Sequence, residues 1–177
     1  MADMMGGVRD RDRDQHLRRL VLAAMFAGLA TLLGSLSIPV GPTRVAPFQH
    51  TINAIAGILV GPWYAAAAAL VTAFLRHSLG WGSLFAFPGS PFGALVVGYA
   101  YRLMRSDAAA LCEPIGTGPI GATLAAWFFQ PLVGSHHTLW WFQIAFLSSS
   151  IPGAILGFVL IRALRRVPAV NGWAVQS

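Results

Sequence analysis

The stretch TINAIAGILVGPWYAAAAALVTAFL, residues 51–75, decides the fold, because it forms either one long helix or two shorter ones. Gly61 and Pro62 lie near its middle. Proline inside a helix removes a backbone hydrogen bond and clashes with the preceding turn, and glycine adds backbone freedom. A break at this pair predicts a short helix of about 13 residues before it, shielded by neighbouring helices or not fully spanning the bilayer.

The distribution of arginine distinguishes these two possibilities. With one helix within residues 48–79 the chain has five spans, and the 12 arginines divide equally between the two sides of a membrane. With a break the chain has six spans, and only Arg44 and Arg76 lie on the side opposite all the other arginines. Basic residues accumulate on the cytoplasmic side, so this asymmetry predicts six spans with both termini in the cytoplasm.

The composition is that of a polytopic, all-α membrane protein. Hydrophobic residues make up 56% of the chain and charged residues only 10%, whereas a soluble domain is about a quarter charged. The charge-free gaps each accommodate a span of about 20 residues. Besides the helices around the Gly61-Pro62 break, we expect helices at 20–38, 88–104, 108–131 and 140–161.

Three parts of the chain follow from this topology: a charged cytoplasmic tail (1–16), a six-helix membrane domain (17–165) and a second cytoplasmic tail (166–177). The first apolar run is longer than the core of a signal peptide and is followed by further runs, so we interpret it as a spanning helix. The net charge of +6 comes from arginines beside apolar runs, not on one amphipathic face, which argues against nucleic-acid binding.

Polar and aromatic residues gather at the outer ends of the expected helices or interrupt the apolar runs. Neutral hydrogen-bonding groups beside aromatic rings suit a small, flat, mostly uncharged heterocycle. The alternative for the aromatic residues, and for Trp140 and Trp141 above all, is an interfacial belt at headgroup depth. The candidate binding residues are Gln49, His50, Asn53, Arg76, Trp81, Phe87, Ser90, Glu113, Thr117, His136 and Gln143.

Two charged candidates have an alternative interpretation. Glu113 lies in an apolar run, where ionisable residues are costly and usually functional, but it is also only about 8 Å from the expected cytoplasmic start of its helix. It could therefore be a near-surface carboxylate that reaches water or an arginine. Arg76 either extends to the outer surface or presents a cation to a ligand oxygen. The prolines and glycines of EPIGTGPIGA, residues 113–122, predict an irregular helix.

Small residues four apart suit close helix contacts. Helix 20–38 carries two such pairs, Ala23 with Ala27 and Ala24 with Gly28. These pairs either pack within the protein or dock on another membrane protein. The single cysteine, Cys112, excludes an internal disulfide and a multi-cysteine metal site.

The sequence indicates neither a cofactor nor a catalytic centre. The adjacent histidines 136 and 137 lack a third ligand at a suitable spacing, so we expect no metal. No G-x-S-x-G motif frames a serine, which argues against an intramembrane hydrolase, and there is no P-loop for ATP hydrolysis.

The segments SIPVGPTRVAPFQHTINAIAGILVGPWYA, LRHSLGWGSLFAFPGSPFGALVVG and EPIGTGPIGA resemble the ThiW family. This family is grouped with the substrate-binding S components of energy-coupling factor (ECF) importers, and the resemblance covers about residues 17–165. It implies a multi-pass protein of the bacterial plasma membrane that binds a thiamine precursor, hydroxyethylthiazole, near the outer face.

The resemblance also implies partners: a transmembrane coupling subunit and two ABC ATPase subunits. Ala23 and Ala27 would form the docking face for the coupling subunit. The longer charged N-terminus and the absence of lysine depart from the family pattern. The competing hypothesis is a stand-alone, ion-coupled transporter of small molecules in which Glu113 carries a proton.

Overall fold

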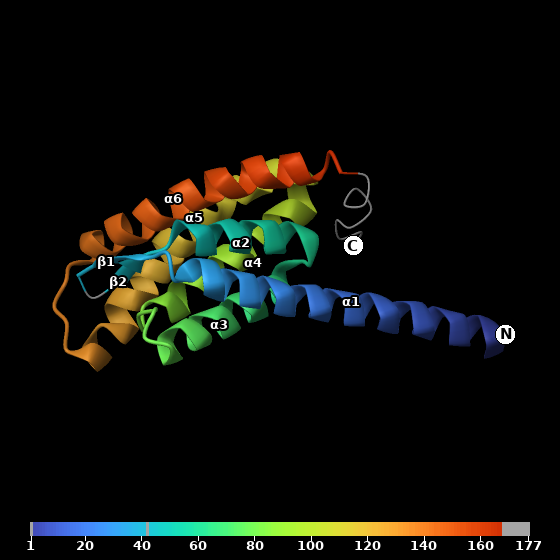
Figure 1. Ribbon diagram of the computed structural model, residues 1–177, viewed down its shortest axis with the longest axis horizontal. Coiled ribbons are helices and arrows are strands. Elements are labelled where there is room, and N and C mark those ends of the chain that lie inside the picture. The colour runs from blue at the N-terminus through green and yellow to red at the C-terminus, as the bar shows by residue number, and fades with distance from the viewer. Residues whose placement is uncertain (1, 42, 168–177) are drawn as a thin grey trace.

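The computed structural model describes residues 2–41 and 43–167, with side chains from Asp12 onward. The structure is all-α, 80% helical with six helices, as predicted. The helices run side by side along the long axis of the molecule (Figure 1). The first helix, α1 (Ala2–Gly34), includes residues 2–16, which we expected as a separate tail. Most of the second expected tail lies outside the described residues.

The predicted break at Gly61-Pro62 is confirmed. Helix α2 (Pro47–Leu59) has the expected 13 residues, and α3 (Pro62–Ser78) begins directly after the break. Gly61 has a φ of 89°, a conformation that L residues with a side chain rarely adopt. Pro62 occupies the first position of α3, where its missing N–H leaves no helical hydrogen bond unmade.

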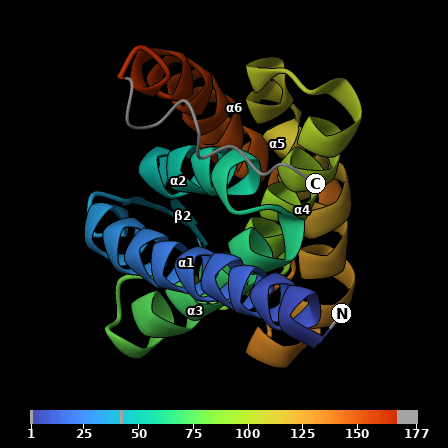
Figure 2. The same cartoon turned by 90° about the vertical axis from the view of Figure 1, so that its right-hand side faces the viewer.

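Helix α2 is the centre of the bundle. Seen from the end of the molecule, it lies between α1 and α6 (Figure 2), and it also packs against α3 and α4 (Ala86–Met104). Every residue from Gln49 to Leu59 is buried, so α2 is shielded by its neighbours, as expected. The C-terminal half of α2 joins an apolar core that includes Ile58, Val97 and Ile161.

The chain between α4 and α6 (Leu139–Leu164) is helical but irregular, as its prolines and glycines predicted. Glycines let this segment approach α4 closely: a Cβ on Gly116 or Gly121 would overlap the α4 backbone. Its parts are the 3₁₀ turn η1 (Asp107–Cys112), the single turn α5 (Glu113–Ile115), the π-helices η2 (Gly116–Ala122) and η3 (Ala125–Phe129), and the 3₁₀ turn η4 (Pro131–Val133).

The loop after α1 forms a small hairpin that we did not predict. Strands β1 (Ile38–Val40) and β2 (Thr43–Val45) pair antiparallel, with Gly41 in the turn. The hairpin lies at the end of the molecule opposite the start of α1 and the end of α6 (Figure 1). The expected helix 20–38 ends four residues early, because α1 ends at Gly34 and residues 35–37 lead into β1.

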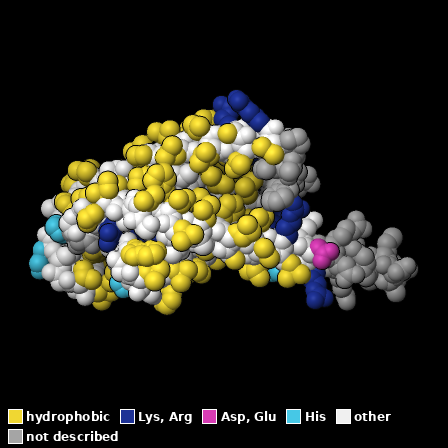
Figure 3. Space-filling model, in the orientation of Figure 1, with side chains coloured by type: hydrophobic (Ala, Val, Ile, Leu, Met, Phe, Trp, Pro, Cys, Tyr) yellow, Lys and Arg dark blue, Asp and Glu magenta, His cyan; other side chains and the backbone are white. Residues whose placement is uncertain are grey.

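The outer surface of the bundle is apolar. Hydrophobic side chains spread over the visible face, while arginines lie near its two ends (Figure 3). Among the described residues two helical stretches are long and apolar enough to cross a membrane, Asp12–Gly34 and Leu139–Leu164. Helices α2 and α3, with 13 and 17 residues, are shorter than an ordinary span of about 20 residues.

The small-residue pairs of α1 lie on different sides of the helix. Ala23 and Ala27 are buried, and they form a cluster with Ala68 of α3. This is the internal-packing alternative, and a partner could contact these side chains only if α1 parted from α3. Ala24 and Gly28 are exposed, and a Cβ added to Gly28 would meet no atom within 4 Å.

Candidate functional site

A small cavity lies beneath the hairpin, beside the first turns of α2 and α4. Its volume is about 30 Å³, which holds roughly two water molecules because one needs about 10–15 Å³. Polar groups line one part of it and phenylalanine rings another. The lining residues are Thr43, Arg44, Ala46, Gln49, His50, Arg76, Ser83, Phe85, Ala86, Gly89, Ser90, Thr117, Ala145, Phe146 and Ser149.

A continuous chain of hydrogen bonds runs along one wall of the cavity, where Arg76, Gln49 and Ser90 line it and Asn53 does not. Arg76 Nη1 donates to Gln49 Oε1, and Gln49 Nε2 donates to Ser90 Oγ over 2.7 Å. Asn53 Nδ2 also donates to Ser90 Oγ, at 2.7 Å, and to the Ser90 carbonyl at 3.2 Å. All four side chains are at most 3% exposed. The structure thus joins four predicted binding residues from three different helices.

The Arg76 guanidinium is buried, so it does not extend to the surface. Its Nη2 donates to the Gly34 carbonyl at 2.9 Å and to the Trp81 carbonyl at 3.1 Å. A Cβ on Gly34 would overlap the guanidinium, so a glycine at the end of α1 makes room for it. The second alternative for Arg76, a cation beside a ligand site, therefore agrees with its position on the cavity wall.

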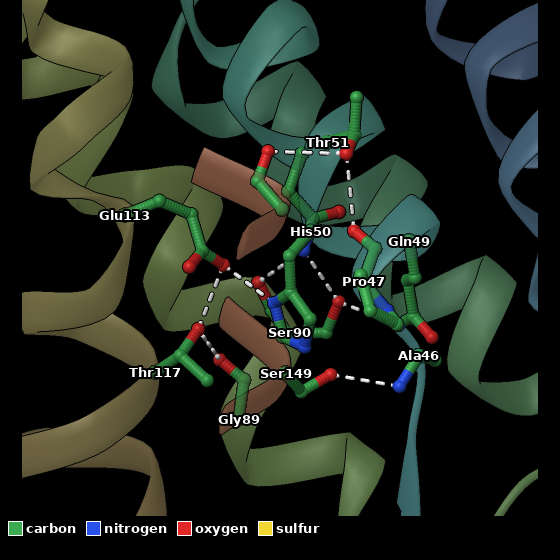
Figure 4. A network of polar contacts seen from close by, with 12 residues as sticks. Ala46, Pro47, Gln49, His50, Thr51, Gly89, Ser90, Glu113, Thr117 and Ser149 are labelled. Carbon is green, nitrogen blue, oxygen red and sulfur yellow. Dashed lines mark hydrogen bonds and ion pairs between the residues drawn. The ribbon is translucent and has the colours of Figure 1, made fainter. Parts of the chain in front are cut away.

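Glu113, His50 and Thr117 form a second buried group beside the first (Figure 4). Glu113 Oε1 lies 2.7 Å from His50 Nδ1, and Thr117 Oγ1 donates to the same oxygen at 2.7 Å. Glu113 is 0% exposed, so the alternative of a near-surface carboxylate is wrong. Its Oε2 has no hydrogen-bond partner among the described residues. His50 and Thr117 line the cavity, whereas Glu113 lies behind them.

Glycine also explains how the carboxyl group fits between the helices. A Cβ on Gly93 of α4 would overlap both Glu113 Oε1 and Thr117 Oγ1. The helical register of α4 therefore requires a residue without a side chain at this point. Nothing in the sequence around Gly93 reveals this partner, which lies twenty residues further along the chain.

Several contacts fix the hairpin over the cavity. Arg44 Nε donates to Ser37 Oγ at 3.1 Å, and Arg44 Nη1 donates to the Gly80 carbonyl at 3.3 Å. The Ala46 amide donates to Ser149 Oγ of α6 at 2.8 Å. The Trp141 ring lies so close to Gly41 that a Cβ there would overlap it. The hairpin is thus attached to the loop after α3 and to α6.

Besides Asn53 and Glu113, four predicted binding residues do not line the cavity. Trp81 is 37% exposed and contributes its carbonyl, not its ring, to Arg76. Phe87 packs edge-on against His77, with ring centroids 6.0 Å apart. His136 is exposed, and Gln143 is half-buried near Gly118. Among the described residues no group of three metal-ligating side chains gathers, at His136 or elsewhere.

The aromatic rings that do line the cavity were missed. Phe85 and Phe146 are 2% and 6% exposed, and both lie on the cavity wall. The sequence offered four aromatic residues near the start of α4 and four near the start of α6, and the rotation of each helix decides which of them face inward. Ser149 was also missed, because its role depends on the Ala46 amide of the hairpin.

Comparison with known proteins agrees with this architecture. A family model described as thiamine-precursor transporter protein (ThiW) matches residues 20–167. This range begins within α1 and ends just after α6, so it contains every residue of the cavity wall. No curated protein matches the chain. The chain therefore belongs to the ThiW family of thiamine-precursor transporters.

Proposed function

We propose that this protein is the substrate-binding S subunit of an ECF-type importer and captures hydroxyethylthiazole, a thiamine precursor. In this proposal it crosses the bacterial plasma membrane six times, with both termini in the cytoplasm and the hairpin outside. A transmembrane coupling subunit and two ABC ATPases complete the importer. Since the sequence carries no P-loop, those ATPases would supply the energy for uptake.

The observation that carries the proposal is the cavity with a polar wall and an aromatic wall. Gln49, Ser90 and Asn53 form a fixed array of hydrogen-bonding groups, while Phe85 and Phe146 offer apolar ring surface. A small heteroaromatic ring needs both, because its faces are apolar and its heteroatoms require hydrogen-bond partners.

The size of the cavity adds a requirement. A volume of about 30 Å³ is too small for a five-membered ring with its substituents. The hairpin contributes Thr43 and Arg44 to the cavity lining and is held by a few polar contacts. Ligand entry therefore requires the hairpin to move outward, and rebinding of Arg44 to Gly80 would close the site over the bound ring.

Calorimetry on the purified, folded protein in detergent tests the proposal. We expect hydroxyethylthiazole to bind, and we expect His50→Ala and Asn53→Ala each to weaken binding by about 1–3 kcal/mol, because each removes a buried polar partner. The control is Ser148→Ala, which alters an exposed hydroxyl of α6. Binding of neither hydroxyethylthiazole nor thiamine nor the pyrimidine precursor to folded protein would refute the proposal.

The buried contact between His50 and Glu113 favours a second candidate function, a stand-alone ion-coupled transporter. A carboxyl group hydrogen-bonded to an imidazole can exchange a proton, and such pairs occur in proton-driven transporters. Reconstitution into liposomes without partner subunits separates the two functions. Uptake driven by a proton gradient and lost in Glu113→Gln would support the second function. ATP-dependent uptake that persists in Glu113→Gln and requires the partners would support the first.

A further inference from the structure

Arg76 is a buried cation whose hydrogen bonds go to neutral oxygens. It is 2% exposed, and within the described part of the chain no carboxylate forms an ion pair with it. Its hydrogen-bond acceptors are the neutral oxygens of Gln49, Gly34 and Trp81. Its Nε is buried and has no hydrogen-bond partner among residues 12–41 and 43–167. A buried charge is costly unless it is paired, so this arrangement favours a ligand that supplies electron density.

The hydrogen-bond chain from Arg76 has only one possible direction. A guanidinium can only donate, so Gln49 must present its oxygen to Arg76 and its NH₂ group to Ser90. Asn53 donates to the same hydroxyl oxygen. A serine hydroxyl has two acceptor positions and one donor hydrogen, and these two amides fill both acceptor positions. The Ser90 hydrogen therefore remains to be donated, and Ser90 lines the cavity.

A second cation lies on the same wall. Arg44 of the hairpin lines the cavity together with Arg76. Glu113 does not line the cavity but lies behind its wall, and its Oε1 contacts His50 and Thr117. A positively charged ligand would thus enter beside two arginines with no carboxylate on the cavity surface. Like charges brought together away from bulk water repel strongly.

We infer that the cavity selects an uncharged heteroaromatic ring that presents a hydrogen-bond acceptor to Arg76 and Ser90, and that it rejects a cationic, N-alkylated ring. The inference rests on the proposed function, since it describes the same site. It separates the free thiazole from thiamine by chemistry, because the ring nitrogen of the free thiazole is neutral and carries a lone pair. In thiamine that nitrogen is alkylated, bears the positive charge and accepts no hydrogen bond.

Three synthetic ligands test the inference on the unmodified protein by calorimetry. The first is hydroxyethylthiazole, the second its derivative methylated on the ring nitrogen, and the third an isomer with the added methyl on a ring carbon. The second and third have nearly the same size, but only the second is charged. We expect the cationic derivative to bind at least about 10-fold more weakly than the neutral isomer. Equal affinity of these two compounds overturns the inference.

A variant of Arg76 then tests whether this residue causes the preference for the neutral ligand. In Arg76→Met the preference for the neutral isomer over the cation should fall by about 10-fold, whereas in Arg102→Met it should not change. Arg102 is exposed and lies over the Tyr99 ring. An unchanged preference in folded Arg76→Met overturns the assignment to Arg76. If Arg76→Met does not fold, the comparison of the two methylated ligands on the unmodified protein still decides the inference.

The outcomes also separate this inference from the proposed function. Equal binding of neutral and cationic ligands would overturn the charge selection and leave the binding function standing. If the folded protein binds none of the three ligands and binds neither thiamine nor the pyrimidine precursor, the proposed function is overturned and the inference with it. Tighter binding of thiamine than of hydroxyethylthiazole would overturn the inference alone.

Discussion

Two glycines make room for the buried side chains of Arg76 and Glu113. Gly34 leaves space for the Arg76 guanidinium, and Gly93 leaves space for the Glu113 carboxyl group. Each charged group then lies within hydrogen-bond reach of α2. The site therefore depends on two glycines that make no polar contact of their own.

Replacing Gly93 by alanine should displace Glu113 and Thr117. The new Cβ overlaps both side-chain oxygens, and overpacking of this kind costs about 1–3 kcal/mol. We expect a lower thermal midpoint in detergent and weaker ligand binding. Gly28→Ala is the matched control, because the added Cβ meets no atom within 4 Å. Equal midpoints and affinities for the two variants would contradict the role of Gly93.

Replacing Ser90 by alanine should leave two buried amides without their acceptor. Gln49 Nε2 and Asn53 Nδ2 both donate to Ser90 Oγ, and an unpaired buried donor costs about 1–3 kcal/mol. We expect a loss of stability in that range and a larger loss of ligand affinity. Chemical unfolding and calorimetry measure the two effects. Ser148→Ala serves as the control, and an effect no larger than that of Ser148→Ala argues against the network.

Much of the polar side of the site could be predicted from the sequence. Gln49, His50, Asn53, Ser90 and Thr117 are conspicuous because a polar group in an apolar run requires a partner or a function. The aromatic side could not be predicted in the same way. Phe85 faces the cavity and Phe87 faces His77, and only the rotation of α4, set by packing far from either residue, distinguishes them.

At the scale of the helices, the break between α2 and α3 followed from local chemistry, and the position of Glu113 did not. Gly61 and Pro62 act on their own backbone, so their effect is visible in sequence. Glu113 is buried because α2, α4 and α6 all pack against α5, and these contacts join segments that are far apart in the sequence. A helical rise of about 1.5 Å per residue measures distance along one helix only, so it could not reveal this burial.

The two sides of α1 should respond differently to a larger side chain. Ala23→Leu places added bulk against Ala68, and we expect it to destabilise the folded protein by about 1–3 kcal/mol. Ala24→Leu lies on the exposed side, and we expect it to change the stability of the isolated protein by less than about 0.5 kcal/mol. Thermal unfolding in detergent measures both.

The same pair of variants reports on partner binding. If the coupling subunit docks on the exposed side of α1, Ala24→Leu impairs co-purification of the complete importer and leaves ligand binding intact. Recovery of a normal complex from Ala24→Leu would show that the partner does not contact this side.

At the scale of the whole molecule, the structure places the start of α1 and the end of α6 at one end and the hairpin at the other (Figure 1). Six spans with both termini inside predict which end each reagent reaches. In a Cys112→Ser background, His136→Cys should react with a membrane-impermeant maleimide in intact cells. Arg166→Cys should react only after permeabilisation. Labelling of Arg166→Cys in intact cells would favour five spans.

The length of α2 has a consequence for the path of a solute. Its 13 residues extend about 20 Å, whereas the hydrocarbon layer is about 30 Å thick. In the proposed topology, with the end of α2 at the inner boundary of this layer, a molecule under the hairpin descends only about a third of the way into the bilayer before it meets the first turn of α2. The apolar core that includes Ile58 packs around the C-terminal half of α2. In the proposed importer, capture and delivery are thus separate events, and delivery requires this core to be displaced or reoriented.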